Sequence, residues 1–274
     1  MTTNALRLLE IADQPEIPVA HGADDPLVGL YEDPPVFVHG DDAQGNVHLP
    51  PPTTTPLGIP AANFIARQVM AHPGEVTLLA VGPLTNLALA LRLQPEIAQA
   101  VRAVVVMGGN ATAPGNATPA AEANIYKDPE AADIVFGAEW PVTMVGLDVT
   151  PKVVFTDAHL AQLSAADDPL AKHCARIAPF YRDFYRSYVA DGFYLHDPSA
   201  LAYVIDPALF KTEAWPIRVQ LEGIGRGKTW PLVNAARIDF PNFAPWRGRP
   251  AVTVCVDVDP DPILAMVLER IAVR

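Results

Sequence analysis

A histidine and an aspartate stand next to each other, at His196 and Asp197, after a stretch rich in aromatic residues. A histidine can supply a proton near neutral pH, and a carboxylate can bind a cation. The aromatic rings upstream could stack on a flat base; they are Phe180, Tyr181, Phe184, Tyr185, Tyr188, Phe193 and Tyr194. Asp197 followed by Pro198 is equally typical of a helix start, with the aspartate as N-cap and the proline in the first turn. The chemical and the structural interpretation do not exclude each other.

A second polar group follows the apolar run that ends at Met107, where two glycines would let a ligand approach the backbone. Asn116, Glu122 and Asn124 come next in the chain. In extended backbone Glu122 and Asn124, two residues apart, would project to the same side. A carboxylate and an amide together suit a vicinal diol, and ribose presents one. Alternatively, Asn116 lies in a turn and Glu122 is merely solvated, and these residues alone leave both interpretations open.

A third candidate is Val81, which is followed by Gly82 and Pro83. The glycine and the proline turn the chain sharply and can leave the Val81 carbonyl pointing into a crevice. A strand, a Gly-Pro turn and a helix are also ordinary turn chemistry. The motif alone therefore favours the structural interpretation.

The elements that must position these residues read as an α/β fold. Continuous apolar runs of strand length at 75–81, 103–107 and 142–145 are separated by predicted helices at 61–71, 84–91 and 128–136. Such runs are typical of a parallel sheet that is covered on both faces. The fold class we predict is an open, mostly parallel, doubly wound sheet. Its ligands should bind outside the carboxyl ends of the strands, where all three candidate groups lie.

The rest of the chain fits one domain over residues 1–274. We predict helices at 3–12, 157–164, 169–190, 197–203 and 262–273, and strands at 217–221 and 251–258. The helix at 3–12 starts in mid-pattern, directly after Met1. Residues 22–60 are rich in Pro, Gly and Asp, and so long a connection inside a compact domain is usually functional or mobile.

Composition narrows the possible partners. The chain has 31 acidic and 19 basic residues, a net charge of −12, which repels a phosphate backbone and argues against nucleic-acid binding. An uncharged nucleoside is not excluded. We find no signal peptide and no apolar run of membrane-spanning length, so we expect a cytoplasmic protein with no membrane partner. We also expect a homo-oligomer, a dimer or tetramer, and free thiols at Cys174 and Cys255 rather than a disulfide.

Eight segments in order resemble the inosine-uridine type nucleoside hydrolases. They are Thr3-Asn4-Ala5-Leu6-Arg7-Leu8-Leu9-Glu10, Val38-His39-Gly40, Val81-Gly82-Pro83-Leu84-Thr85-Asn86, Met107-Gly108-Gly109, Gly115-Asn116-Ala117-Thr118-Pro119, Glu122-Ala123-Asn124-Ile125, Asp128-Pro129-Glu130-Ala131-Ala132 and His196-Asp197-Pro198. The resemblance covers nearly the whole chain. It implies a calcium-dependent enzyme of nucleoside salvage that cleaves the N-glycosidic bond of ribonucleosides to ribose and free base.

The resemblance also implies roles for individual residues. Asp197 and the Val81 carbonyl correspond to calcium ligands, and His196 to the acid that protonates the leaving base. The ribose and base contacts implied are Asn116, Glu122, Asn124 and Met107, with His39 in a mobile loop that closes over the base and Phe184, Tyr185 and Tyr188 on the opposite wall. Cleavage passes through an oxocarbenium-like sugar, so negative charge beside the ribose would help.

The resemblance fails at the start of the chain. The family begins with a strand and an Asp-x-Asp-x-x-x-Asp-Asp loop that supplies calcium ligands and the general base, and no such loop precedes the first helix here. We therefore expect an incomplete calcium site, impaired hydrolysis and an exposed strand in the sheet. A late start codon, a shortened gene or a non-catalytic ribose-binding relative would each explain the difference. Ala123 replaces a frequent aromatic residue, and residues 42–46 replace a glycine-rich loop, which leaves the base preference open.

Overall fold

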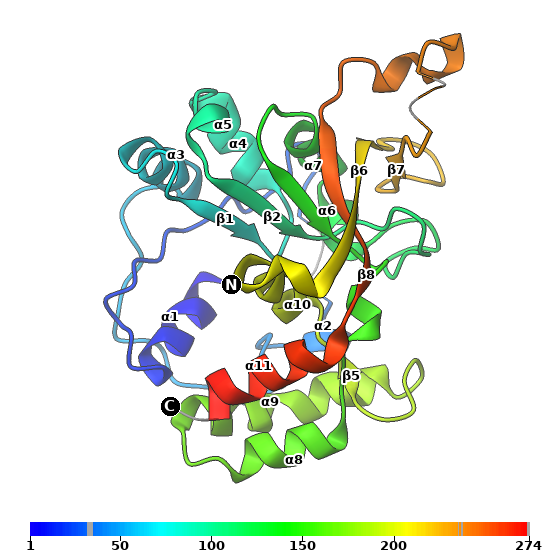
Figure 1. The fold of residues 1–274 in the computed structure, drawn as a ribbon. Coiled ribbons are helices and arrows are strands. Elements are labelled where there is room, and N and C mark those ends of the chain that lie inside the picture. The colour runs from blue at the N-terminus through cyan, green and yellow to red at the C-terminus, as the bar shows by residue number, and fades with distance from the viewer. Residues whose placement is uncertain (32–34, 235, 237, 273–274) are drawn as a thin grey trace.

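A six-stranded sheet organises the chain in the computed structural model, which describes residues 1–31, 35–234, 236 and 238–272 (Figure 1). The strand order is β1-β2-β3-β8-β6-β7, and a separate pair is formed by β4 and β5. The strands are β1 (Thr77–Ala80), β2 (Ala103–Met107), β3 (Val142–Val145), β4 (Val154–Phe155), β5 (Phe193–Tyr194), β6 (Phe210–Val219), β7 (Thr229–Pro231) and β8 (Ala251–Val258). The first four strands in the order run parallel, whereas β6 pairs antiparallel with both of its neighbours.

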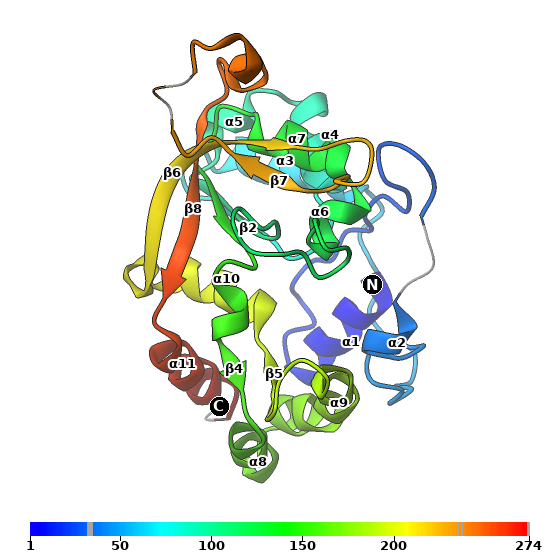
Figure 2. The same cartoon turned by 90° about the vertical axis from the view of Figure 1, so that its right-hand side faces the viewer.

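Helices cover both faces of this sheet, as the apolar runs predict. They are α1 (Thr2–Ile11), α2 (Val36–His39), α3 (Ala61–Ala71), α4 (Thr85–Leu93), α5 (Ile97–Ala100), α6 (Ala123–Lys127), α7 (Pro129–Phe136), α8 (Asp157–Ala165), α9 (Pro169–Tyr185), α10 (His196–Ile205) and α11 (Pro260–Ala272). Short 3₁₀ turns include η1 (Thr150–Lys152) and η4 (Pro241–Trp246). Figure 2 shows α3, α4, α5 and α7 on one side of the sheet and α8 to α11 on the other.

Alternate residues of each parallel strand enter the two layers of the core. Val104 and Val106 pack with α3, α4 and α7, while Val105 and Met107 pack with α8, α9, α10 and α11. Because both faces of β2 and β3 are buried, an uninterrupted apolar run is what these strands need. The α/β fold class is thus confirmed.

The outer side of β1 is an edge of the sheet among the described residues. Leu79 in this strand is 36% exposed, and Val81 just beyond it is 45% exposed. β1 is therefore an exposed edge strand. Within the described residues, no helix is long and apolar enough to cross a membrane.

Two predicted elements differ most in length. The strand predicted at 217–221 is instead β6, which begins at Phe210 and ends at Val219. The side chains at 211–214 in its first half are exposed, so this half carries no apolar run. Residues 210–216 of β6 nevertheless pair with β8. The helix predicted at 169–190 ends at Tyr185 because the chain turns back there towards β5. The predicted end of the last helix, Val273, lies outside the described residues.

The 22–60 connection wraps around α1. Arg7 donates to the carbonyls of Leu49 and Pro50, each at 2.8 Å. One oxygen of Glu10 accepts four hydrogen bonds of 2.7–2.8 Å from the backbone and hydroxyl groups of Thr53 and Thr54. These contacts fix the Pro- and Thr-rich part of the connection against the first helix.

Candidate active site

The three polar groups that the sequence singles out meet at the carboxyl ends of the parallel strands. Val81 follows β1 directly, and Met107 is the last residue of β2. Ala80 is paired with Val106, so Val81 and Met107 are the next residues along the two strands. The helix α10, which begins with His196, packs on both β1 and β2. The site is therefore assembled where a doubly wound sheet places its ligands.

Glu122 is the N-cap of α6, and its carboxylate is enclosed by backbone donors. It accepts hydrogen bonds from the backbone N–H groups of Gly109 at 3.0 Å, Asn124 at 2.9 Å and Ile125 at 3.1 Å. The extended geometry predicted for Glu122 and Asn124 is wrong, because a carboxylate that caps free N–H groups starts a helix here. Burial raises the pKa of Glu122 to about 7 against the opposing effect of these hydrogen bonds.

The amide groups of Asn116 and Asn124 each bind the backbone through one atom, which leaves complementary atoms available. Asn116 Oδ1 accepts from the backbone N–H of Ala123 at 2.9 Å, which leaves its Nδ2 to donate. Asn124 Nδ2 donates to the Met107 carbonyl at 3.1 Å, which leaves its Oδ1 to accept. A diol needs both kinds of partner, since each hydroxyl can donate and accept.

Asp197 lies inside the first turn of α10 rather than at its N-cap. The N-cap is Leu195, so the predicted capping role of Asp197 is wrong, and the carboxylate is left free for the site. Asp197 as a residue is exposed to solvent. The protein around its carboxylate still removes part of the water that would stabilise the charge, and this desolvation raises the pKa of Asp197 to about 6. Asp197 is close enough to Glu122 for its charge to raise the pKa of Glu122 as well. Two carboxyl groups thus share one side of the site.

His196 belongs to a chain of hydrogen bonds. Its Nδ1 lies 2.7 Å from Thr150 Oγ1, and its Nε2 lies 2.9 Å from the Tyr185 hydroxyl. The Tyr181 hydroxyl donates to that of Tyr185 at 3.3 Å. Burial lowers the pKa of His196 to about 4, so the ring is neutral at neutral pH. One ring nitrogen then donates a hydrogen bond and the other accepts one.

Aromatic residues of α9 continue this network outwards. Tyr185 packs edge-on against Phe184, and Phe184 is tilted against Tyr188, with ring centroids 5.1 and 5.5 Å apart. His39 lies in α2 and stacks on Tyr181 with an interplanar angle of 11°. His39, which the sequence analysis placed in a loop, is thus brought next to the aromatic residues of α9. Tyr188 lies beyond the end of α9 and is 64% exposed, at the outer rim.

Thr150 is a site residue that the sequence analysis missed. It follows β3 in the segment 146–150 and is fully buried in η1. The rule that polar residues after a strand line the site applies to this segment too, and it would have pointed to Thr150 and to Asp148.

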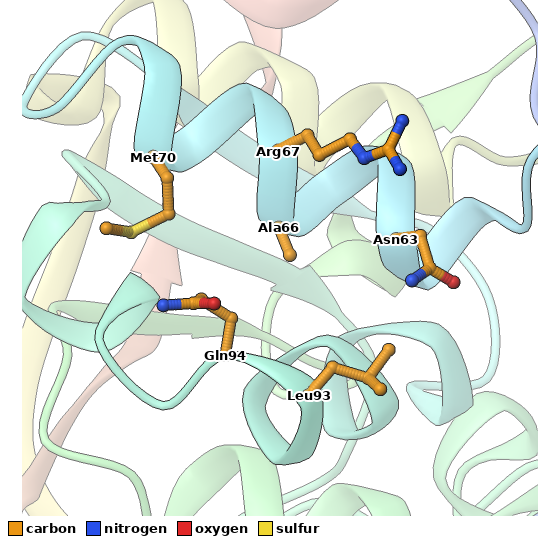
Figure 3. A pocket seen from close by; sticks show the side chains of 6 residues that line it. All are labelled: Asn63, Ala66, Arg67, Met70, Leu93 and Gln94. Atoms are coloured by element: carbon orange, nitrogen blue, oxygen red, sulfur yellow. The ribbon is translucent and has the colours of Figure 1, made fainter.

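A surface groove of about 280 Å³ lies elsewhere on the molecule. Figure 3 shows it between α3 and the C-terminal end of α4, lined by Asn63, Ala66, Arg67, Met70, Leu93 and Gln94. None of the residues of the candidate site lines this groove, so it takes no part in the chemistry described above.

Comparison with known proteins shows the family of this chain. The family model of the inosine-uridine preferring nucleoside hydrolases matches residues 1–265. Probable uridine nucleosidase 1 of rice is 42% identical over 271 residues, which span 98% of this chain and 82% of the relative. The inosine-uridine preferring nucleoside hydrolase of Leishmania major is 38% identical over 262 residues, which span 94% of this chain and 81% of the relative.

Solved structures give the same answer. A plant nucleoside hydrolase, the PpNRh1 enzyme, superposes with a TM-score of 0.95 and 37% identity, covering 100% of this chain and 86% of that one. A purine-preferring ribonucleoside hydrolase from Gardnerella vaginalis superposes with a TM-score of 0.89 and 32% identity, covering 99% of this chain and 84% of that one. The chain therefore belongs to the inosine-uridine preferring nucleoside hydrolase family and is a nucleoside hydrolase.

Proposed function

We propose that this nucleoside hydrolase acts at the carboxyl ends of β1, β2 and β3, and that uridine is among its substrates. The observation that carries the proposal is that two carboxyl groups, Glu122 and Asp197, lie close enough to interact, with two amides next to Glu122 and a histidine–tyrosine network next to Asp197. The amides and carboxyl groups suit a ribose, and the histidine–tyrosine network suits a base. The relatives named uridine nucleosidase in rice and Arabidopsis support uridine.

On the ribose side, the chain's own residues bind and orient the sugar. Asn116 Nδ2 donates to a hydroxyl, and Asn124 Oδ1 accepts from one. Negative charge on Asp197 stabilises the oxocarbenium-like sugar of the transition state. Because the pKa of Asp197 is raised only to about 6, this carboxylate is mostly ionised at neutral pH.

On the base side, His196 and Tyr185 act as a pair. With a pKa near 4, His196 does not hold a second proton at neutral pH. The acid that protonates the leaving base is therefore a neutral N–H or O–H group of this pair, and the hydrogen bond of 2.9 Å between them lets a proton move from one to the other. The rings of Phe184 and Tyr188 form the wall against which a base stacks.

Calcium, which the family resemblance implies, fits part of this site. Asp197 and the Val81 carbonyl offer oxygen, the ligand atom that calcium takes, but calcium takes about 6–8 oxygens. Within the part of the chain that the structure describes, no three His, Cys, Asp or Glu residues are grouped to hold a metal. We therefore propose weak binding, with a dissociation constant on the order of 10⁻⁴–10⁻³ M. Bound calcium would supply positive charge that fixes the diol and acidifies water.

Product analysis tests the proposal. The protein is incubated with uridine and with inosine, in chelator and in rising calcium, and ribose and free base are quantified. We expect equal amounts of ribose and base, and a rate that rises with calcium over the millimolar range. Binding of ribose by calorimetry with no release of base would show a ribose-binding protein instead and would overturn the proposal.

Three further features stay predictions: a homo-oligomer, a cytoplasmic location and a role in nucleoside salvage. Light scattering after gel filtration gives the mass directly, and a monomer of 29.4 kDa would contradict the expected dimer or tetramer.

A further inference from the structure

The segment 110–113, directly after β2 and its two glycines, has its backbone bound by a carboxylate. Asp148, which follows β3, accepts from the N–H groups of Ala111 at 2.7 Å, Thr112 at 2.7 Å and Ala113 at 3.0 Å. The Thr112 hydroxyl donates to the same carboxylate at 2.6 Å. Three successive backbone donors thus converge on one side chain.

An ammonium group binds the carbonyl groups of the same segment. Lys228 is 8% exposed, and its Nζ donates to the carbonyls of Asn110 at 2.5 Å, Ala111 at 3.3 Å and Ala113 at 3.4 Å. A buried ammonium is costly unless it is hydrogen-bonded. All three carbonyls that accept from the Lys228 ammonium belong to this short segment, so these hydrogen bonds hold its backbone in place.

The two neighbours of Lys228 in the chain also contact the 110–113 segment or α6. Thr229 Oγ1 accepts from the Asn110 N–H at 2.8 Å and donates to the Asn110 carbonyl at 2.9 Å. Gly227 has a φ of +84°, and a Cβ there would lie 2.9 Å from Tyr126 Cα in α6. The turn between β6 and β7 is therefore packed closely on both the 110–113 segment and α6.

We propose that Asp148 and Lys228 form a clamp that positions the ribose-binding side of the active site, an inference that rests on the proposed function. The clamped segment leads into the loop that carries Asn116 and then Glu122. That loop has neither helix nor strand between 110 and 122, so its shape depends on such side-chain contacts. A displacement of about 1 Å at a substrate-positioning group costs about a hundredfold in rate.

Amide hydrogen exchange tests the clamp without any substrate. In Asp148→Asn the bonds that protect the amides of Ala111, Thr112 and Ala113 are lost or weakened, and in Lys228→Met the carbonyls that hold the same segment lose their donor. Exchange at the three amides should therefore quicken by about tenfold or more in both variants. The amides of β3 should not change. Unchanged protection of the segment in both variants would overturn the clamp.

Kinetics then separate positioning from mere stabilisation. Both clamp variants should lower kcat/KM by about ten- to a hundredfold, and by the same factor for uridine, inosine and p-nitrophenyl riboside, because all three share the ribose. The matched control is Arg226→Met, which removes the hairpin's ion pair with Glu130 at 2.7 Å but no contact to the 110–113 segment. The control should lower thermal stability and leave kcat/KM unchanged.

The outcomes are distinguishable. Clamp variants that lose only thermal stability, like Arg226→Met, would overturn the positioning role even where the wild-type protein is active. A wild-type protein that cleaves no ribonucleoside would instead contradict the proposed function, and the exchange experiment would still decide whether the clamp exists.

Discussion

Replacing Thr150 with valine probes the base side of the site most sharply. The Thr150 hydroxyl is fully buried and lies 2.7 Å from His196 Nδ1, so its removal leaves a buried ring nitrogen without a partner. Such a loss costs about 1–3 kcal/mol. If the ring must be held in place only in the transition state, kcat falls by about 5-fold to 150-fold, at 1.4 kcal/mol for each factor of ten.

The assay compares two substrates in Thr150→Val, with Thr150→Ser as the control that keeps the hydroxyl. Uridine has a poor leaving group and should show the full loss in kcat, whereas p-nitrophenyl riboside needs no protonation and should lose much less. Replacement of His196 by alanine should show the same contrast. Equal losses on both substrates, or a serine variant as slow as the valine variant, would refute the reasoning.

Three other predictions concern the ribose side and stability. Asn124→Ala should lower kcat/KM about tenfold or more on both inosine and uridine, because a diol hydroxyl loses its partner, and unchanged kinetics would remove Asn124 from the site. Hydrogen bonds from Thr54 and Thr53 lower the pKa of Glu10 to about 2, so the stability it contributes is present above pH 4.5 and is lost as the pH falls towards 2. Thermal unfolding of Glu10→Gln should therefore depend less on pH in that window than that of the wild type, and equal slopes would contradict this. Asp133 forms ion pairs with Arg218 at 3.0 Å and with Arg249 at 2.8 Å, and Asp133→Ala removes both. The free energy of unfolding, measured with denaturant, should fall by about 3 kcal/mol while activity is retained.

Much of the α/β frame could be predicted from the sequence, because its strands are buried on both faces. The bounds of β2, β3 and β8 agree with the predicted strands, as do those of α3 with its predicted helix. β6 begins seven residues before its predicted start at 217, at Phe210, because a strand with one solvent-facing half has no continuous apolar run. The free thiols at Cys174 and Cys255 are also as predicted.

The sequence singled out residues that the structure brings together, but it did not predict how they are arranged. Motifs pointed to Asp197 and Glu122, yet the helix cap that was one of two interpretations of Asp197 does not form, and Glu122 forms a cap that was not predicted. The side chain that caps a helix belongs to the residue that takes non-helical backbone angles just before the first turn, and residue types alone do not specify which residue that is. Thr150 contacts His196, 46 residues further along the chain, and Lys228 contacts Asn110, 118 residues away. A local sequence pattern cannot predict contacts between segments so far apart.

The ribose-side carboxylate gives the most direct test of the account. The measurement is kcat/KM for uridine in saturating calcium, for Asp197→Asn and for the matched control Asp206→Asn at the other end of α10. We expect a loss of about a thousandfold for Asp197→Asn, because transition-state charge stabilisation of several kcal/mol is removed, and no loss for the control. An Asp197→Asn variant that cleaves uridine at the wild-type rate would contradict the account.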